Sequence, residues 1–328
     1  MDKIKVIVTG AGALLGQGMI RSLKQSSLKT HIVGLDPSPY SAGLYWSDSS
    51  HLIPFANDPN YIDYIINIIK LELPDAILVG TDVELHSFAK HRQMLEDEYG
   101  VHILVSSTRV IDIADDKYLT YKFLKNNGFS FPETCLPGDE EKLIAKVGFP
   151  LIVKPRIGAR SYGVHKVNDQ DTLNRLIKNK DKVLIQEYVS TSEDEYTASA
   201  LVFNGSCDAS IVMRRELRDG NTYRVYVEQY NKLNQRIRAL GETLNPHGSV
   251  NFQFRLDGSQ IKVFEINSRF SGTTPLRAHA GFNEVELCLR RILWDEPIIQ
   301  PQIEEMTILR HWSETIIKKD NLINYIEK

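Results

Sequence analysis

Three oxygen-bearing side chains in the C-terminal third of the chain have the types and the spacing of a magnesium site. Gln253 lies in one short apolar run, and Glu265 and Asn267 lie in the next, beyond an Asp-Gly-Ser turn at residues 257–259. Because side chains alternate across a strand, these odd-numbered residues can share one face of a β-hairpin. Mg²⁺ needs few protein oxygens and completes its octahedron with water and phosphate oxygens. The alternative is a solvated polar face on an ordinary hairpin.

The pairing register decides whether these groups gather on one face. The three side chains share a face only if the numbers of two residues paired across the hairpin sum to an even value. A three-residue loop at 257–259 provides that register, whereas a two-residue loop would provide it only with a bulge. Arg269, two residues beyond Asn267, could then reach a transferring phosphoryl group. The apolar set expected on the opposite face is Phe252, Phe254, Phe264 and Ile266.

A second candidate site follows a strand expected over residues 151–155. Lys154 lies near the end of this strand, and a glycine-bearing loop with two arginines follows at 156–163. A lysine there can neutralise nucleotide phosphates, while the loop offers backbone N–H groups to their oxygens. Taken alone, Lys154 could equally be a solvated charge. The loop residues expected at the phosphates are Gly158, Ser161 and Gly163.

The strand expected over residues 183–189 could form the edge of an adenine site. Such an edge offers backbone groups to the base while apolar side chains cover its faces, and Glu195 nearby could bind ribose hydroxyls. On its own the pattern indicates only a buried strand. The residues expected at this edge are Gln186, Glu187, Tyr188 and Val189.

Arginines and acids elsewhere are candidates for substrate binding. Arg214, Arg215 and Arg277 could hold a carboxylate, because an arginine fork matches its geometry; surface ion pairing is the alternative. Asp82 and Glu84 follow an N-terminal strand at the sheet edge where open α/β folds bind ligands. Asp82 could instead cap a helix, with Glu84 favoured by the first-turn dipole.

A glycine loop near the N-terminus offers a different interpretation. Gly10, Gly12 and Gly16 follow the first strand and open a helix, as in dinucleotide-binding loops, and Asp36 stands where a ribose-binding acid belongs. An NAD(P)-dependent reductase or epimerase is therefore an alternative. The same glycines would also serve a tight turn and close packing.

Apolar periodicity predicts the elements that must position these residues. Residues 1–107 alternate strands and helical patterns, which predicts a parallel sheet with helices on its faces. From residue 150 the strands are close in sequence, which predicts an antiparallel sheet with helices on one side. Strands are expected at 5–9, 31–35, 76–79, 101–105, 151–155, 162–167, 183–189, 196–203, 207–214, 222–228, 249–256, 260–267 and 306–311, and helices after residue 107 at 108–113, 117–126, 139–147 and 283–294.

Composition excludes several partners. With 328 residues, 42% hydrophobic and 25% charged, the chain can form two or three cores, as a multi-domain enzyme does. A net charge of −3 without a long basic stripe argues against nucleic acid. The chain enters a strand at once and has no membrane-length apolar run, so we expect a cytoplasmic protein with no membrane partner.

The order of these features resembles that of ATP-grasp ligases, and most closely the branch of the carbamoyl-phosphate synthetase large subunit, whose metal-binding strand also carries glutamine. The resemblance covers nearly the whole chain. It implies an N-terminal α/β domain at 1–107, followed by an α+β ATP-grasp fold whose subdomains, at 108–185 and 186–328, clamp ATP. The features are Lys117, Val153-Lys154-Pro155, the glycine loop, residues 186–189, Glu195, Gln253 and residues 265–269.

The resemblance also implies roles for individual residues. Lys117 and Lys154 would contact the phosphates, residues 186–189 would bind adenine, and Glu195 would bind ribose. Arg269 would hold the γ-phosphate and the acyl phosphate formed from it. The loop at 156–163 has fewer glycines than in many relatives. The metal ligands would be Gln253, Glu265 and Asn267, holding two Mg²⁺ ions for which Mn²⁺ could substitute.

The implied activity is that of a carboxylate–amine ligase. A small-molecule carboxylate and ATP would form an acyl phosphate and ADP, and an amine would then displace phosphate to give an amide or peptide-like bond. The chain could assemble as a homodimer. A subunit that senses ATP without chemistry of its own is a further alternative.

Overall fold

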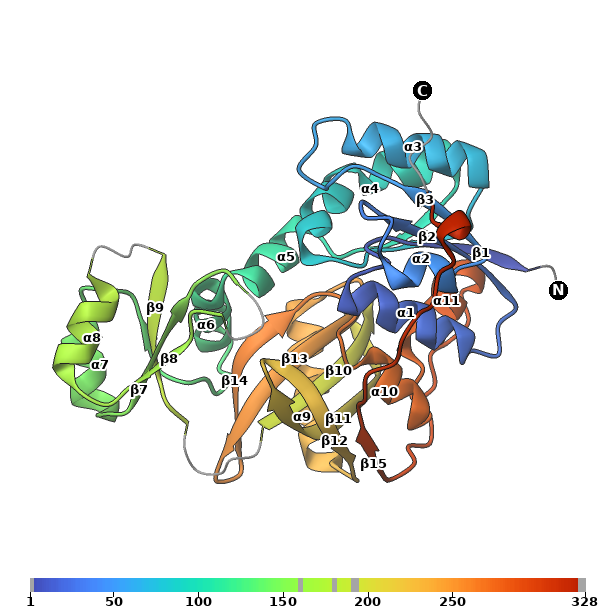
Figure 1. The fold of residues 1–328 in the computed structure, drawn as a ribbon. Helices are drawn as coiled ribbons and strands as arrows, with labels where there is room; N and C mark the ends of the chain where they lie inside the picture. Colours follow the sequence, from blue (N-terminus) through green and yellow to red (C-terminus); the bar gives the residue numbers. More distant parts are fainter. Residues whose placement is uncertain (1–2, 159–161, 179–181, 190–194, 324–328) are drawn as a thin grey trace.

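The computed structural model describes residues 3–158, 162–178, 182–189 and 195–323 of the chain. Figure 1 shows a small lobe, which contains β7, β8, β9, α7 and α8, set apart from a larger body. The larger body contains a parallel sheet near the N-terminus and a long antiparallel sheet beneath it.

The N-terminal domain is an all-parallel sheet with the strand order β3-β2-β1-β4-β5. Helices cover both of its faces, so its central strand is apolar on both sides, and Val6, Ile7 and Val8 are fully buried. Gly100 ends the last helix with a left-handed φ of 66°, as expected of a C-cap. The elements are β1 (Ile4–Val8), α1 (Leu14–Lys24), β2 (Thr30–Asp36), α2 (Ala42–Trp46), β3 (Ser49–Leu52), α3 (Tyr61–Glu72), β4 (Ala76–Leu78), η1 (Asp82–Glu84), α4 (Leu85–Tyr99) and β5 (His102–Leu104).

The small lobe is built on a four-stranded antiparallel sheet with the order β6-β9-β7-β8. Its core contains Leu143, Leu173 and the inward residues of the strands, such as Val153 and Ile185. Helices α7 and α8 pack against this sheet and close that core (Figure 1). The elements are β6 (Thr134–Cys135), α7 (Glu140–Val147), β7 (Leu151–Pro155), β8 (His165–Val167), α8 (Gln170–Ile177) and β9 (Val183–Glu187).

A six-stranded antiparallel sheet, in the order β14-β13-β10-β11-β12-β15, forms the centre of the molecule. Helices α5, α6 and α9 pack on one face, and α1, α10 and α11 pack on the other. Because both faces are covered, β10 is buried along nearly its whole length. The elements are α5 (Thr108–Asp115), α6 (Lys117–Asn126), β10 (Glu195–Phe203), β11 (Ser206–Arg218), β12 (Asn221–Val227), α9 (Asn231–Leu244), β13 (Gly248–Asp257), β14 (Gln260–Asn267), α10 (Thr274–His279), α11 (Glu284–Trp294), β15 (Met306–Leu309) and η2 (Lys319–Asn321).

The predicted fold class, a parallel-sheet domain followed by an α+β part, is confirmed. The antiparallel strands divide between two sheets, where one was expected. The expected subdomain boundary between residues 185 and 186 falls inside β9, because Gln186 and Glu187 still pair with β7. Helices α5 and α6, although they precede the small lobe in sequence, contribute to the core under the six-stranded sheet.

Several elements were not predicted. They are α2, β3, β6, α8, α9, α10 and the short helices η1 and η2. The strand expected at 162–167 begins only at His165. Within the described ranges, no helix combines the length and apolar character that crossing a bilayer requires.

Candidate active site

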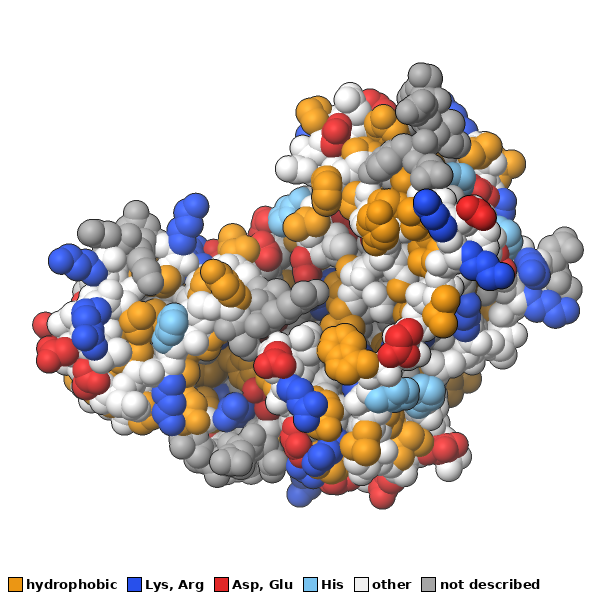
Figure 2. Space-filling view, viewed as in Figure 1, with side chains coloured by type: hydrophobic (Ala, Val, Ile, Leu, Met, Phe, Trp, Pro, Cys, Tyr) orange, Lys and Arg blue, Asp and Glu red, His pale blue; other side chains and the backbone are white. Residues whose placement is uncertain are grey.

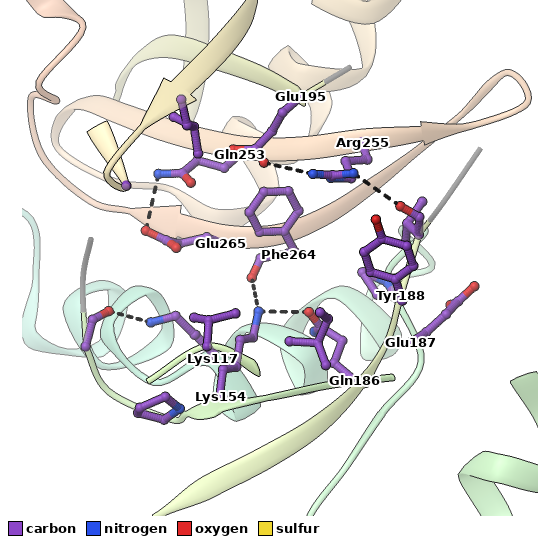
Figure 3. Close-up of a pocket in the computed structure, with 18 of the residues that line it drawn as sticks. Lys117, Lys154, Gln186, Glu187, Tyr188, Glu195, Gln253, Arg255, Phe264 and Glu265 are labelled. Carbon is purple, nitrogen blue, oxygen red and sulfur yellow. Dashed lines mark hydrogen bonds and ion pairs between the residues drawn. The ribbon is translucent and has the colours of Figure 1, made fainter. Parts of the chain in front are cut away.

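A cavity of about 210 Å³ lies between the small lobe and the β13–β14 hairpin (Figure 3). In Figure 3, Lys117, Lys154 and Gln186 lie on one wall, and Gln253 and Glu265 lie on the opposite wall. We call this space the first cavity. Two of the three residues expected to bind metal, Gln253 and Glu265, therefore face the same space as the two lysines, although they come from a different part of the fold. The third, Asn267, lines a larger cavity beyond them.

Lys154 is buried on β7, with its ammonium group directed into the first cavity. Its Nζ donates to Oε1 of Gln186 at 2.8 Å and lies 3.5 Å from the carbonyl oxygen of Phe264. Burial lowers the pKa of Lys154 to about 8, against the attraction of Glu265. Among the described residues it has no carboxylate within ion-pair distance, so it is a buried cation available to an anionic ligand.

Lys117 opens α6 and lines the same cavity. Its Nζ donates to the carbonyl oxygen of Gly158 at 2.7 Å, which ties the helix to the glycine loop. Arg156, at the start of that loop, is ion-paired with Asp116, the N-cap of α6, and is therefore engaged elsewhere. Gly163 has a φ of 71°, with Pro155 within 3.0 Å of where a Cβ would sit. Ser161 lies outside the described residues.

The expected adenine edge also lines the first cavity, with Glu187, Tyr188 and Val189 following Gln186. Lys262 of β14 pairs with the Glu187 carboxylate at 2.6 Å and so joins the edge to the hairpin. Glu195, at the start of β10, lines the mouth. Its carboxylate is paired with Arg215 at 2.5 Å and with Arg255 at 3.3 Å.

The pairing register of the β13–β14 hairpin differs from the predicted one, but Gln253 still faces Glu265, as predicted. Asp257 pairs with Gln260, so the loop has two residues and not three, and a bulge at Phe264 restores the even sum by which Gln253 faces Glu265. The bulge also turns Phe264 out of the apolar set. Its ring lines the first cavity, 5.6 Å from Nζ of Lys154, and Val263 takes the buried position.

Glu265 is the point on which the three expected metal ligands converge. Its Oε1 accepts from Nε2 of Gln253 at 3.2 Å and from Nδ2 of Asn267 at 3.1 Å. The Gln253 Oε1 accepts from Arg215 at 2.7 Å, and the Asn267 Oδ1 accepts from Arg269 at 3.0 Å. A rotation of each side-chain amide by 180° would exchange the positions of its nitrogen and oxygen. The amide oxygens of Gln253 and Asn267 and a carboxylate oxygen of Glu265 would then face one point.

Arg269 reaches across to the N-terminal domain. Its guanidinium forms a two-point ion pair with Asp82, at 2.7 and 3.1 Å. Burial disfavours the charged form of Asp82, but Arg269 outweighs that effect and lowers the pKa. Glu84, expected beside Asp82 at the cleft, is instead buried and accepts from Thr9 and Thr81. The hydroxyl of Tyr61 in α3 also donates to it, so the η1 turn directs Glu84 into the interior of the N-terminal domain.

The three arginines predicted to bind the substrate do not lie in one site. Arg215 lies in the cleft, paired with Glu195, whereas Arg214 lies on the opposite face of β11, 3.8 Å from the ring centroid of Tyr226. Neighbouring strand residues face opposite sides, so the two could not share a site. Arg277 is fully buried and ion-paired with Glu284 at 2.9 Å. Arg214 and Arg277 therefore do not line the cavities of the cleft.

A larger cavity of about 580 Å³ continues from the hairpin toward the N-terminal domain, and we call it the second cavity. Leu14 and Leu15 of α1, Asp82 of η1 and the Asn267 edge of the hairpin line it. Thr197 and Asn251, which were not predicted as site residues, also line it. Asn251 pairs with Asn267 across the hairpin. Its odd number places it on the same face of β13 as Gln253, so the alternation rule could have predicted it as a site residue.

Family comparison agrees with this geometry. A model described as an ATP-grasp domain matches residues 114–273, and one described as a PylC-like N-terminal domain matches residues 6–104. The chain contains an ATP-grasp domain. Its limits include Lys117, Lys154, residues 186–189 and the β13–β14 hairpin, so every residue of the first cavity belongs to the matched segment.

Relatives of this ATP-grasp chain include carbamoyl phosphate synthase large chains. That of Caldanaerobacter subterraneus is 26% identical over 313 residues, and that of Methanosarcina mazei is 23% identical over 311 residues. Each alignment covers 85% of this chain but 28% of the relative. The chain therefore spans little more than a quarter of the length of these relatives.

Solved ATP-grasp structures share the fold. N5-carboxyaminoimidazole synthetase from Staphylococcus aureus, complexed with ADP, matches with a TM-score of 0.73 at 17% identity, over 94% of this chain and 83% of that chain. A biotin carboxylase from Campylobacter jejuni matches with a TM-score of 0.67 at 14% identity, over 88% and 70%. At these identities the likeness shows the fold alone.

The ATP-grasp hairpin also fits a magnesium ion chemically. Among the described residues, no cluster of three His, Cys, Asp or Glu side chains could form an all-protein metal cage. One carboxylate and two amides beside two lysines suit an ion whose remaining ligands are phosphate oxygens and water.

The N-terminal glycine loop of this ATP-grasp chain is closed by its own side chains. The Asp36 carboxylate accepts from the Gly12 backbone N–H at 2.7 Å and from the Ser41 hydroxyl at 2.5 Å. A Cβ on Gly12 would lie 2.2 Å from the Ser41 oxygen. Asp36, which a dinucleotide would need for its ribose, is therefore bonded within the protein, and Ser41 fills the space beside Gly12. The glycines of this loop serve close packing.

Proposed function

We propose that this chain is an ATP-dependent carboxylate–amine ligase that releases ADP and phosphate. The observation that carries the proposal is the convergence of Gln253, Glu265 and Asn267 opposite two lysines, Lys117 and Lys154. The first cavity supplies cations for phosphates, the 186–189 edge for a base, and metal ligands between the two cavities.

The reaction has two steps. A carboxylate oxygen attacks the γ-phosphorus of ATP, the bond to the bridging oxygen breaks, and ADP leaves. The amine nitrogen then attacks the acyl carbon, the bond to the phosphate oxygen breaks, and phosphate leaves while the amine loses its proton. Neither step needs a nucleophile from the protein, so positioning and charge neutralisation provide the catalysis.

Each residue has one task in this scheme. Lys117 and Lys154 bind phosphate oxygens, and Mg²⁺ held by the hairpin would neutralise charge on the β- and γ-phosphates. Arg269 would exchange Asp82 for the transferred phosphoryl group. Arg215, which borders both cavities, remains the arginine candidate for the activated carboxylate. Glu195 is proposed to bind ribose, and residues 186–189 adenine.

The comparisons support this assignment at the level of the nucleotide. A solved relative of the same fold is complexed with ADP, and the sequence relatives are carbamoyl phosphate synthase large chains. Small-molecule substrates are proposed because the second cavity, at about 580 Å³, has the size of a ligand pocket.

A screen of carboxylate and amine pairs for phosphate release, with mass spectrometry of the products, tests the proposal. It predicts release that depends on both partners, and loss of activity by more than ~100-fold in Glu265→Gln with the fold intact, because lost charge stabilisation is costly. Activity of Glu265→Gln within about threefold of wild type would contradict the metal role. ATP binding without ADP release across the panel would favour a nucleotide sensor instead.

A further inference from the structure

The second cavity extends beyond the residues that the proposed chemistry uses. It runs from Lys117 and Glu265 past Asn267 to a wall formed by Leu14 and by Arg310, which directly follows β15. Figure 1 shows β15 at the outer edge of the six-stranded sheet, beside the segment that carries α10. A substrate in this cavity therefore has the reacting centre near Glu265 and a second contact surface at Arg310.

Arg310 is held by backbone groups only. Its guanidinium donates to the carbonyl oxygens of Gly272 and, at 3.4 Å, Thr222. No carboxylate lies within ion-pair distance of it among the described residues. Arg21 of α1 is close enough to add repulsion, and this effect and, more strongly, burial lower the pKa of Arg310 to about 10.

The other two arginines of this cavity differ in that respect. Arg269 is neutralised by Asp82, and Arg215 by Glu195. A guanidinium has five N–H donors, and Arg310 places two bonds on carbonyl oxygens, which leaves donors for a ligand. A partly buried cation without a counter-ion is unfavourable unless an anion joins it.

We propose that Arg310 binds a carboxylate of the substrate other than the one that is activated. This inference rests on the proposed function and adds the substrate class: one of the two partners carries a carboxylate that stays free through the reaction. Nη1 and Nη2 of Arg310 each donate one N–H to a carbonyl oxygen, so Nε–H and the second N–H of each terminal nitrogen stay available for a carboxylate. Leu14, which packs against Gly272, offers an apolar wall to the chain between the two ends of that substrate.

The true substrate is not needed to test this site. The test compares the Tm of the protein in the presence of malonate, a dicarboxylate, with its Tm in the presence of malonamide, the uncharged diamide of the same size. MgADP is present throughout, so that Lys117 and Lys154 are occupied by phosphates. At ~50 mM, malonate should raise the Tm of the wild-type protein by about 2 °C more than malonamide does, because ligand that binds only the folded state stabilises it. Arg310→Gln should lose that difference.

Two further variants keep the test decisive. Arg310→Lys retains the charge and should keep about half of the malonate effect, which separates charge from fold. Arg236→Gln removes an exposed guanidinium that also donates to a backbone carbonyl, that of Ser259, and should behave as wild type. Equal effects of malonate and malonamide on wild type, or a malonate effect that survives in Arg310→Gln, would overturn the inference.

The stabilisation by MgADP alone separates this inference from the proposed function. If MgADP raises the Tm of wild type and of Arg310→Gln equally while malonate does not discriminate, only the carboxylate site is wrong. If MgADP has no effect on any variant, the nucleotide site itself is wrong.

Discussion

Arg269 and Asp82 form a two-point ion pair that joins the end of the β13–β14 hairpin to the N-terminal domain, with Nε to Oδ1 at 2.7 Å and Nη2 to Oδ2 at 3.1 Å. The arginine proposed to hold the γ-phosphate is thus bound to a carboxylate. In the proposed reaction, Asp82 would compete with the transferred phosphoryl group for the same donors.

Replacing Asp82 should therefore favour the triphosphate. In Asp82→Asn we expect affinity for a non-hydrolysable ATP analogue to rise roughly three- to tenfold, since a charged hydrogen-bonded pair no longer has to be exchanged. Affinity for ADP, which lacks the γ-phosphate, should change less than about twofold. Isothermal titration calorimetry measures both.

Asp112 of α5 provides the matched control, because it is an exposed acid that is paired with His86 and does not line the second cavity. Asp112→Asn should leave both affinities unchanged. Equal changes for the analogue and for ADP in Asp82→Asn would mean that Asp82 does not compete for Arg269.

The pair of Arg277 and Glu284 should contribute to folding and not to substrate binding. Both side chains are fully buried, and the guanidinium also donates to Asn251 at 2.6 Å. Glu284→Gln leaves a buried guanidinium without its counter-ion and should lower the free energy of unfolding by ~3 kcal/mol or more. Urea denaturation measures this loss.

Glu296 gives a contrast for that measurement, because its ion pair with Arg290 is only partly buried. Glu296→Gln should cost less than ~1 kcal/mol. A Glu284→Gln protein as stable as wild type would show that the buried pair is dispensable, and Arg277 would again be a candidate for ligand binding.

Lys154 should make nucleotide binding pH-dependent. Its pKa of about 8 in the free protein means that the binding cation is lost as pH rises through 8. Affinity for MgADP should fall roughly fivefold between pH 8 and pH 9, as the protonated fraction does. In Lys154→Arg this dependence should disappear, because arginine stays charged.

The stability of the free protein should respond in the opposite direction. Between about pH 8 and the ordinary lysine pKa near 10.4, the unfolded chain binds a proton at Lys154 that the folded chain does not, so this residue makes folding more favourable as pH rises. Affinity that rises with pH, or a wild-type pH profile that Lys154→Arg reproduces, would contradict the assignment of Lys154 as a buried phosphate-binding cation.

Much of this site could be predicted because strand alternation is a local rule. The odd numbers of Gln253, Glu265 and Asn267 predict that they share one face of the hairpin, and the structure agrees. Within the hairpin, the loop length and the side faced by Phe264 differ from the prediction, because nothing in the sequence marks the bulge. By the same alternation, the consecutive residues Arg214 and Arg215 face opposite sides of β11 and could not bind one ligand together. The odd-numbered Asn251 lies on the same face of β13 as Gln253. Helix α9 also had a readable signal, since Ile237, Leu240, Gly241 and Leu244 have helical spacing.

Other features depend on contacts between distant segments. The bond between Asp82 and Arg269 joins residues 187 positions apart, and Arg310 enters the cleft because β15 pairs with β12. Glu84 and Asp82 are two residues apart and face different environments, which only the η1 turn decides. Sequence patterns identify such residues as polar but do not show what they meet.

The central claim is that the β13–β14 hairpin holds a magnesium ion on a nucleotide in the first cavity. Calorimetric titration of ADP into wild type and Glu265→Gln, each with Mg²⁺ and with EDTA, tests it most directly. Wild type should bind ADP at least ~10-fold more tightly with Mg²⁺, and Glu265→Gln should bind ADP equally under both conditions, since the ion's protein carboxylate is gone. An Mg²⁺ effect of full size in Glu265→Gln, or no binding of ADP by wild type, would contradict the account.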